Sequence, residues 1–213
     1  MILVVVAVRA EAGAVLGGAA ASQARGPYEV GVAGPLIVVA GGVGPARAAA
    51  CAGTLLALDR YDLVVSAGVG GGFPDRATVG DVVVADRVVH ADLGADSPAG
   101  FVPLDRLGFG EVSTALDPAL VADAARRTGA RVGPVVTVST ATGTAERAKA
   151  LAAAYDPVAE GMEGAGVLAA AAAHGVPFLE LRAISNAVGQ RDRDAWDLPR
   201  ALVALGRAAK ALR

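Results

Sequence analysis

Cysteine and aromatic residues are scarce in this chain of 213 residues. Cys51 is the single cysteine, and aromatic residues make up 4% of the sequence. One cysteine excludes an intrachain disulfide framework and makes a reducing cytoplasm the expected compartment. Cys51 falls in a predicted helix with no histidine near it, which indicates a buried structural thiol rather than a nucleophile. Hydrophobic residues still reach 54%, so the core must consist mainly of alanine, valine and leucine.

Excess charge and long apolar runs are also absent. The formal net charge of -2 argues against a nucleic-acid-binding protein, which needs a strongly basic face. The longest apolar runs fall short of a transmembrane helix; the run at 167–173, for example, stops at His174. The N-terminal run at 2–8 is short and no basic residue precedes it, unlike a secretion signal. We therefore expect a soluble, cytoplasmic protein that binds neither nucleic acid nor membranes.

Apolar stretches alternate with helical patterns along the chain. The expected strands, buried on both faces, are residues 2–8, 36–40, 63–66, 82–85, 132–138 and 178–184. The expected helices are residues 45–58, 118–127, 145–154, 163–173 and 198–212. This alternation predicts a single domain, 1–213, with a three-layer α/β/α fold around a mixed, mostly parallel central sheet. Residues 91–110 interrupt it as a long loop, which in a compact domain is usually a lid or a binding loop.

Glu11 follows directly after the first expected strand. Position alone favours a structural interpretation, in which the carboxylate lies near a helix N-terminus and is stabilised by the helix dipole. The functional interpretation rests on the rule that open α/β sheets bind ligands beyond the carboxyl ends of their strands. A carboxylate in that place could take a proton from a water molecule that attacks a sugar.

A second candidate, Glu163, lies in the segment EGMEGAG at 160–166, where an alanine-rich helix is expected to begin. Glutamate is common in a first helical turn, so a purely structural role is the simplest explanation. Glycine on both sides of Met162-Glu163 is less natural for an ordinary helix, because each glycine costs about 1 kcal/mol in a helix interior. Small residues also let a ligand approach the backbone closely.

The segment RAISNAVG at 182–189 ends the last expected strand in Ser185 and Asn186. The amide of Asn186 can donate hydrogen bonds to N7 and O6 of a 6-oxopurine, which are adjacent acceptors. It can also pair with the N6 and N7 edge of adenine, so the amide alone does not decide the base. An asparagine that only forms a turn at the strand end is the structural alternative.

Two glycine-rich segments, at 41–44 and 68–72, each follow an expected strand. Neither has the spacing of a dinucleotide-binding fingerprint or of a P-loop. Close approach of the backbone to a ligand at the strand ends is the more natural role, and Gly68 is predicted to contact that ligand.

EGMEGAG and RAISNAVG together resemble motifs of the purine nucleoside phosphorylase and nucleosidase superfamily. Similarity to its futalosine hydrolase family spans nearly the whole chain and includes residues 90–110, 137–144 (TVSTATGT) and 190–196 (QRDRDAW). The resemblance implies a nucleoside phosphorylase-like fold and hydrolysis of futalosine to hypoxanthine and dehypoxanthine futalosine, on the route to menaquinone. It implies no cofactor, and a homo-oligomer that is at least a dimer.

The resemblance also implies roles for the candidate residues. Glu11 corresponds to the glutamate that activates water in nucleosidases. Met162 corresponds to a methionine that packs on the ribose, and Glu163 to a glutamate that accepts hydrogen bonds from the 2′ and 3′ hydroxyls. Ser185 is placed beside the substrate. Adenosine-type members carry aspartate at the position of Asn186, so asparagine there indicates a hypoxanthine leaving group.

Phosphorylases of this superfamily hold phosphate with an arginine and a serine or threonine in the second glycine-rich segment. The matching positions here are Ser66 and Val69. The missing arginine favours water over phosphate as the nucleophile.

Futalosine bears a carboxyphenyl ketone on its 5′ side. Arg191 or Arg193 could bind its carboxylate, although ion pairs with the neighbouring aspartates are the simpler explanation for both arginines. Phe101, Phe109 and Trp196 are candidates for the aromatic end of the site and equally for the core.

Three further points limit the function. His90 and His174 lack the partners of a metal site, so no metal is predicted. A methylthioadenosine or adenosylhomocysteine nucleosidase is one alternative, and it should differ at Asn186. A nucleoside-binding protein without turnover is the other, because a fold alone does not imply catalysis.

Overall fold

The computed structural model describes residues 1–18, 20–190, 192 and 194–213. The main sheet has the strand order β11-β10-β6-β12-β5-β1-β4-β3-β2, with β9 paired to β6, and β7 and β8 form a separate pair. The strands are β1 (Ile2–Val6), β2 (Ala21–Arg25), β3 (Tyr28–Ala33), β4 (Leu36–Ala40), β5 (Leu63–Gly72), β6 (Val82–His90), β7 (Gly94–Ala95), β8 (Val102–Pro103), β9 (Ser113–Ala115), β10 (Arg131–Thr137), β11 (Ala159–Gly161) and β12 (Phe178–Ala187). The helices are α1 (Arg9–Leu16), α2 (Pro45–Leu58), α3 (Pro118–Thr128), α4 (Ala145–Tyr155), α5 (Gly164–Ala173) and α6 (Leu198–Ala211).

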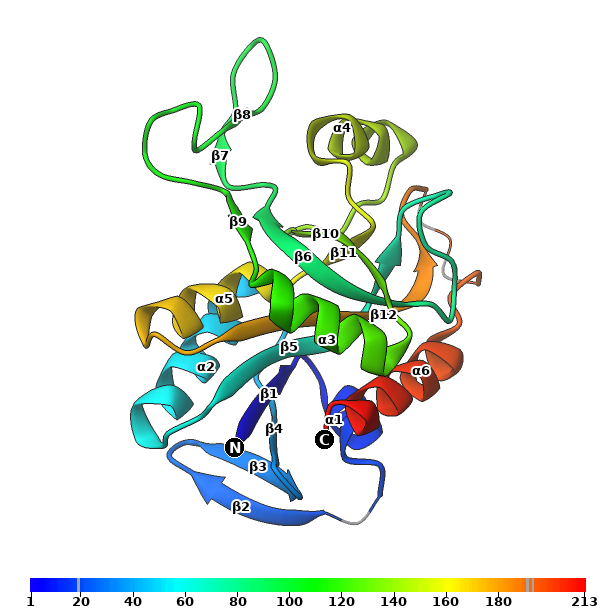
Figure 1. Cartoon of the computed structure of the whole chain (residues 1–213). Helices are drawn as coiled ribbons and strands as arrows, with labels where there is room; N and C mark the ends of the chain where they lie inside the picture. Colours follow the sequence, from blue (N-terminus) through cyan, green and yellow to red (C-terminus); the bar gives the residue numbers. More distant parts are fainter. Residues whose placement is uncertain (19, 191, 193) are drawn as a thin grey trace.

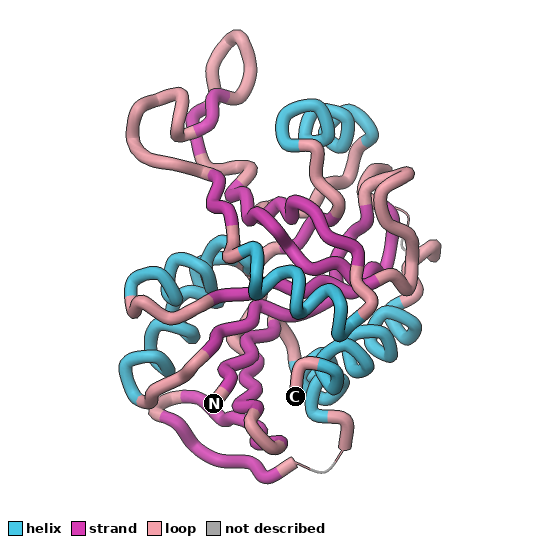
Figure 2. Tube along the Cα trace, in the orientation of Figure 1, coloured by secondary structure: helices cyan, strands magenta, loops and turns pink. Residues whose placement is uncertain are grey.

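The sheet is mixed, and its centre is mostly parallel. Parallel pairs join β1 to β4 and β5, β5 to β12, and β10 to β6 and β11. Helices α2 and α5 pack against each other, and α1 and α3 pack against α6. Figures 1 and 2 show helices on both sides of the sheet. The predicted α/β/α arrangement around a mixed central sheet is therefore confirmed.

One end of the sheet curls back on itself. β11 pairs in parallel with β10, and it also pairs antiparallel with the end of β5, where Ala159 lies opposite Gly72 and Glu160 opposite Gly71. Strands β5, β12, β6, β10 and β11 thus close into a ring. This closure brings the ends of β5, β11 and β12 together, which no strand assignment from sequence could show.

The expected elements are present, but several boundaries differ. β1 ends at Val6 rather than residue 8, and the chain turns at once into α1. This helix was not among the expected ones, although the structural interpretation of Glu11 implied a helix there. β5 was expected to stop at 66 but continues through the glycines to Gly72. The hairpin of β2 and β3 was also missed, because most residues of β2 are exposed and neither strand contains an apolar run.

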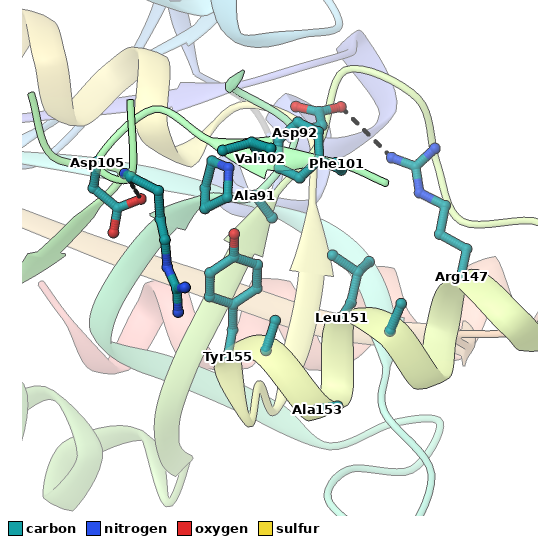
Figure 3. A pocket seen from close by; sticks show the side chains of 13 residues that line it. Ala91, Asp92, Phe101, Val102, Asp105, Arg147, Leu151, Ala153 and Tyr155 are labelled. Atoms are coloured by element: carbon teal, nitrogen blue, oxygen red, sulfur yellow. Dashed lines mark hydrogen bonds and ion pairs between the residues drawn. The ribbon is translucent and has the colours of Figure 1, made fainter. Parts of the chain in front are cut away.

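The long loop does contain a short hairpin, β7–β8, which projects from the body of the domain beside α4 (Figure 1). Its residues line a cavity of about 950 Å³ against α4, with Phe101 on the loop side and Tyr155 on the helix side (Figure 3). An ion pair between Asp92 and Arg147 lies at one end of this cavity. The loop does not line the cavity at Glu11 described below, so its predicted role as a binding loop does not apply to that site.

The core is built from valine, leucine, isoleucine and alanine on both faces of the sheet, as the composition predicted. Cys51, in α2, is fully buried and free, which confirms the interpretation as a structural thiol. Burial raises the pKa of the Cys51 thiol to about 11. No helix in the described ranges is long and apolar enough to cross a membrane.

Candidate active site

A cavity of about 280 Å³ lies where the C-terminal ends of β1, β5, β11 and β12 meet the start of α5. Three carboxylates line it, from Glu11, Glu160 and Glu163, together with Ser185 and Asn186. All three glutamates are less than 8% exposed. The structure thus brings together Glu11, Glu163 and Asn186, which lie far apart in the sequence.

Glu11 is held by three backbone N–H groups. Its Oε2 accepts hydrogen bonds from the N–H groups of Ala7 and Val8 at 2.9 and 3.0 Å, and its Oε1 accepts one from Val69 at 2.9 Å. The first two contacts cap α1, so the structural interpretation holds for Oε2. A carboxylate offers about four acceptor positions, and the fourth, on Oε1, is left for another donor. Glu11 is therefore a preoriented acceptor at the edge of the cavity.

Glu163 is the N-cap residue of α5, which begins one residue after the predicted start at 163. Its Oε1 accepts a hydrogen bond from Gly44 N–H at 3.2 Å, and its Oε2 accepts from Met162 N–H at 3.3 Å and from Arg182 Nη1 at 3.0 Å. Three acceptor positions are occupied and one remains. A diol that binds through both hydroxyls would need that position and would have to displace one of the longer backbone contacts.

Arg182 supports this site, and its importance was not predicted. It is 1% exposed; its guanidinium donates to Glu163, to Oε1 of Glu180 at 2.9 Å through Nε, and to Oγ of Ser66 at 3.0 Å through Nη2. Burial alone would lower the pKa of Arg182, but Glu180, Glu163 and Glu11 outweigh it and raise the pKa above its ordinary value. Arg182 is thus a permanent cation that ties β12 to β5 and to the start of α5.

Glu180 completes this buried cluster from the same face of β12, two residues before Arg182. Burial raises the pKa of Glu180, and Arg182 opposes that rise. Among the described residues, Oε2 of Glu180 has no hydrogen-bond partner. The pattern Glu-x-Arg in an otherwise apolar strand was the available sequence signal, because residues at i and i+2 share one face of a strand.

Asn186 lies at the end of β12 and lines the cavity. Its Oδ1 lies 2.8 Å from the hydroxyl of Ser185, which donates to it, and its Nδ2 donates to the carbonyl of Ala187 at 3.0 Å. One N–H of the amide is therefore left for a ligand. Ser185 was predicted to bind substrate, but its hydroxyl is engaged in orienting Asn186 and also approaches the Gly70 carbonyl at 3.3 Å.

Gly68 has a different place from the one predicted. It does not line the cavity; a Cβ built on it would lie 2.7 Å from Oε1 of Glu11 and 3.0 Å from Nη1 of Arg182. The space left by its missing side chain is filled by protein rather than by a ligand. Gly70 and Gly71 are the residues of this segment that line the cavity. The glycines lie within β5 itself rather than in a loop after it.

The other predicted residues are divided between the site and the surface. Met162 and Trp196 line the cavity. Phe101 and Phe109 do not line it and are 46% and 77% exposed, so neither is a core residue. Arg191 and Arg193, the candidate partners of the substrate carboxylate, lie outside the described residues.

Ser66 and Val69, at the positions that hold phosphate in phosphorylases, serve other contacts. The hydroxyl of Ser66 accepts from Arg182 and is fully buried, and the N–H of Val69 binds Glu11. His90 lies 3.6 Å from Asp92, outside this cavity. Within the described ranges, no group of three or more histidine, cysteine, aspartate and glutamate side chains could hold a metal ion.

Comparison with known proteins gives a consistent result. Residues 4–212 match the model of the phosphorylase superfamily. The chain is 58% identical to a futalosine hydrolase of Streptomyces coelicolor over 79% of this chain and 74% of that protein. It is 44% identical to a futalosine hydrolase of Acidothermus cellulolyticus, over 99% and 89% of the two chains. A solved structure of a futalosine hydrolase mutant from Helicobacter pylori has the same fold, with a TM-score of 0.84 at 21% identity, over 99% of this chain and 97% of that one.

Proposed function

Because the chain belongs to the futalosine hydrolase family of the phosphorylase superfamily, we propose that it hydrolyses the N-glycosidic bond of futalosine. The products are hypoxanthine and dehypoxanthine futalosine, which is used for menaquinone. The observation that carries this proposal is the meeting of Glu11, Glu163 and Asn186 around one buried cavity. Each of these three residues supplies a group that the reaction needs.

The first step is the departure of the purine. As the glycosidic bond breaks, electron density moves into the base and positive charge develops on the sugar, as in other glycoside cleavage. The remaining N–H of the Asn186 amide donates a hydrogen bond to N7 or O6 of the base. This hydrogen bond stabilises the leaving base without transfer of a proton. Ser185 orients this amide and acts as a positioning residue.

The developing sugar cation is stabilised by the charge beneath it. Glu11, Glu163 and Glu180 surround the single guanidinium of Arg182, and all four side chains are buried. When the carboxylates are ionised, the cluster carries a net negative charge close to the ribose. Glu163 binds the ribose hydroxyls, Met162 packs on the sugar, and the cation is favoured because buried charges interact strongly.

Water completes the reaction. The one acceptor position left on Glu11 binds the water, and the carboxylate takes its proton as the oxygen attacks the anomeric carbon. The departed purine anion takes up one proton from solvent to give hypoxanthine, and Glu11 returns its proton to solvent, so the site is restored. No arginine occupies the matched phosphate positions, where Ser66 and Val69 hold other groups. These contacts favour water over phosphate, and the mechanism uses no cofactor and no metal.

Incubation with futalosine, inosine and methylthioadenosine, with and without phosphate, tests this function through chromatography of the products. We expect hypoxanthine from futalosine at the same rate in both buffers. Adenine from methylthioadenosine as the main product would instead assign the chain to the neighbouring nucleosidases. A requirement for phosphate would make it a phosphorylase, and the absence of any product would leave a nucleoside-binding protein.

We also propose that the enzyme is a cytoplasmic homo-oligomer. Phe101 and Phe109 are exposed on the projecting loop, and Val8 and Val43 are exposed at the rim of the cavity. Contiguous apolar surface marks a contact with another protein, so these side chains are where a partner copy would pack. Light scattering of the purified chain tests the assembly. A monomer at micromolar concentration would contradict it.

A further inference from the structure

Glu160 is a third carboxylate in the cavity that the reaction above leaves without a role. It is 7% exposed and comes from β11, three residues before Glu163. Its Oε1 accepts a hydrogen bond from Thr142 N–H at 2.9 Å, and its Oε2 accepts one from Thr142 Oγ1 at 2.5 Å. Two of about four acceptor positions are thus occupied, and two remain. A buried carboxylate with open acceptor positions on a ligand cavity is suited to a ligand that donates.

The closed ring of strands places Glu160 across from Asn186. Gly71 of β5 is the register partner of Glu160 in β11 and of Asn186 in β12. The two residues are therefore separated by two strand spacings, about 10 Å between backbones. Gly71 lies between them without a side chain, and a Cβ there would lie 2.7 Å from Cγ2 of Val188 and 3.4 Å from Nδ2 of Asn186. Val188 also lines the cavity, so a flat base that reaches from Asn186 to Glu160 would pack on this apolar side chain.

The chemistry of the two purines differs on the side that faces Glu160. In a 6-oxopurine, N7 and O6 are acceptors on one edge, and N1 carries a hydrogen on the far side of O6. In adenine, N1 carries a lone pair and no hydrogen. Asn186 can serve either base, because an amide both donates and accepts. A second group must therefore decide between them, and a carboxylate accepts from N1–H but is repelled by a lone pair.

We propose that Glu160 accepts a hydrogen bond from N1–H of the purine and so selects 6-oxopurine over 6-aminopurine nucleosides. This inference rests on the proposed function, since it takes the cavity to hold the base of the substrate. Thr142 positions the carboxylate through its two hydrogen bonds. Burial raises the pKa of Glu160, although Thr142 and Arg147 oppose the rise; a more basic carboxylate is a better acceptor.

The Glu160→Gln variant separates this role from a structural one. Glutamine keeps the shape, and its oxygen and NH2 group can maintain both contacts with Thr142. It can also donate to N1 of adenine. We expect kcat/KM for futalosine to fall roughly 10- to 100-fold, the worth of a hydrogen bond to a charged group. For the 6-amino analogue of futalosine, kcat/KM should stay the same or rise. The ratio of kcat/KM for futalosine to kcat/KM for the analogue should therefore fall at least as much as kcat/KM for futalosine itself.

Glu146→Gln is the matched control, because it makes the same change at an exposed glutamate outside the cavity. Its ratio of kcat/KM for futalosine to kcat/KM for the 6-amino analogue should stay within a few-fold of the wild-type ratio. An unchanged ratio in Glu160→Gln, or an equal loss of selectivity in both variants, would overturn the proposal.

Binding of free hypoxanthine and adenine, measured by calorimetry on wild type and Glu160→Gln, gives a readout that needs no turnover. Wild type should prefer hypoxanthine, and the variant should lose this preference. If Glu160→Gln loses the preference for hypoxanthine but the wild type does not cleave futalosine, the proposed function is wrong and the role of Glu160 stands. If the wild type cleaves futalosine but wild type and Glu160→Gln have the same base preference, the proposed function stands and the role of Glu160 is wrong.

Discussion

Replacing Glu11 with glutamine tests the chemical step most sharply. The amide has nearly the same shape, but it cannot take a proton from water. Removal of a general base usually costs a factor of about 10²–10⁴ in rate. At about 1.36 kcal/mol for each factor of ten, the barrier should rise by about 3–5 kcal/mol. We therefore expect kcat for hypoxanthine release to fall by this factor, with a much smaller change in KM.

The structure predicts a second, separate effect of the same change. In the wild type, the N–H of Val69 donates to Oε1 of Glu11 at 2.9 Å. If the glutamine oxygen in the variant accepts the hydrogen bonds from the N–H groups of Ala7 and Val8, its NH2 group faces the N–H of Val69 instead. One buried donor then lacks an acceptor, at a cost of about 1–3 kcal/mol in the free energy of unfolding. Urea unfolding measures this loss independently of the rate.

Kinetics and urea unfolding of Glu11→Gln should be compared with Glu111→Gln, a change at an exposed glutamate outside the cavity. The control should match wild type in both measurements. A Glu11→Gln protein that retains kcat within a few-fold of wild type would refute the assignment of Glu11 as the base, whatever its stability.

Three further predictions concern the buried framework. Arg182→Met should lower the free energy of unfolding by about 3–5 kcal/mol in urea, because it leaves buried carboxylates without their cation; an unchanged midpoint would show that the cluster contributes no net stability. Gly166→Ala should destabilise by about 1–3 kcal/mol, since its Cβ would lie 2.0 Å from the Pro45 carbonyl oxygen, whereas Gly13→Ala, with open space around it, should stabilise α1 or leave it unchanged. Equal thermal midpoints for these two variants would contradict the packing argument. Cys51, with its pKa raised to about 11, should resist alkylation at pH 8 until the protein unfolds, as mass spectrometry of the labelled protein can show. Rapid labelling of the native protein would contradict this prediction, because it would mean that the thiol is accessible.

Much of the scaffold could be predicted because buried strands and capped helices leave local signals. The valine-rich runs marked most of the central strands, and Pro45 and Pro118 marked the first turns of two helices. Strand ends were less predictable. Glycine argues against a strand interior, yet β5 continues to Gly72 because β12 and β11 pair with it there and supply the hydrogen bonds.

Sequence motifs and the family resemblance placed Glu11, Glu163 and Asn186 in one site, and the structure brings these three together. Arg182 was missed because its partners come from other elements, and a charged residue within a strand gives no local sign of them. Glu160 was missed for a related reason. Its position across Gly71 from Asn186 depends on the register of three strands, which only the closed sheet shows.

Gly68 shows the opposite case, in which a correct local observation leads to a wrong role. A glycine at the end of a strand does allow close approach, but the approaching group is the side chain of Glu11. The sequence cannot distinguish a ligand from another part of the protein as the occupant of that space.

A crystal structure of the Glu11→Gln variant with futalosine bound tests the location of the reaction most directly, because slow turnover preserves the substrate. We predict the ribose hydroxyls at Glu163, the N7 and O6 edge of the base at Asn186, and the anomeric carbon facing the side chain at position 11. Futalosine bound elsewhere, for example between the projecting loop and α4, would contradict the account of this active site.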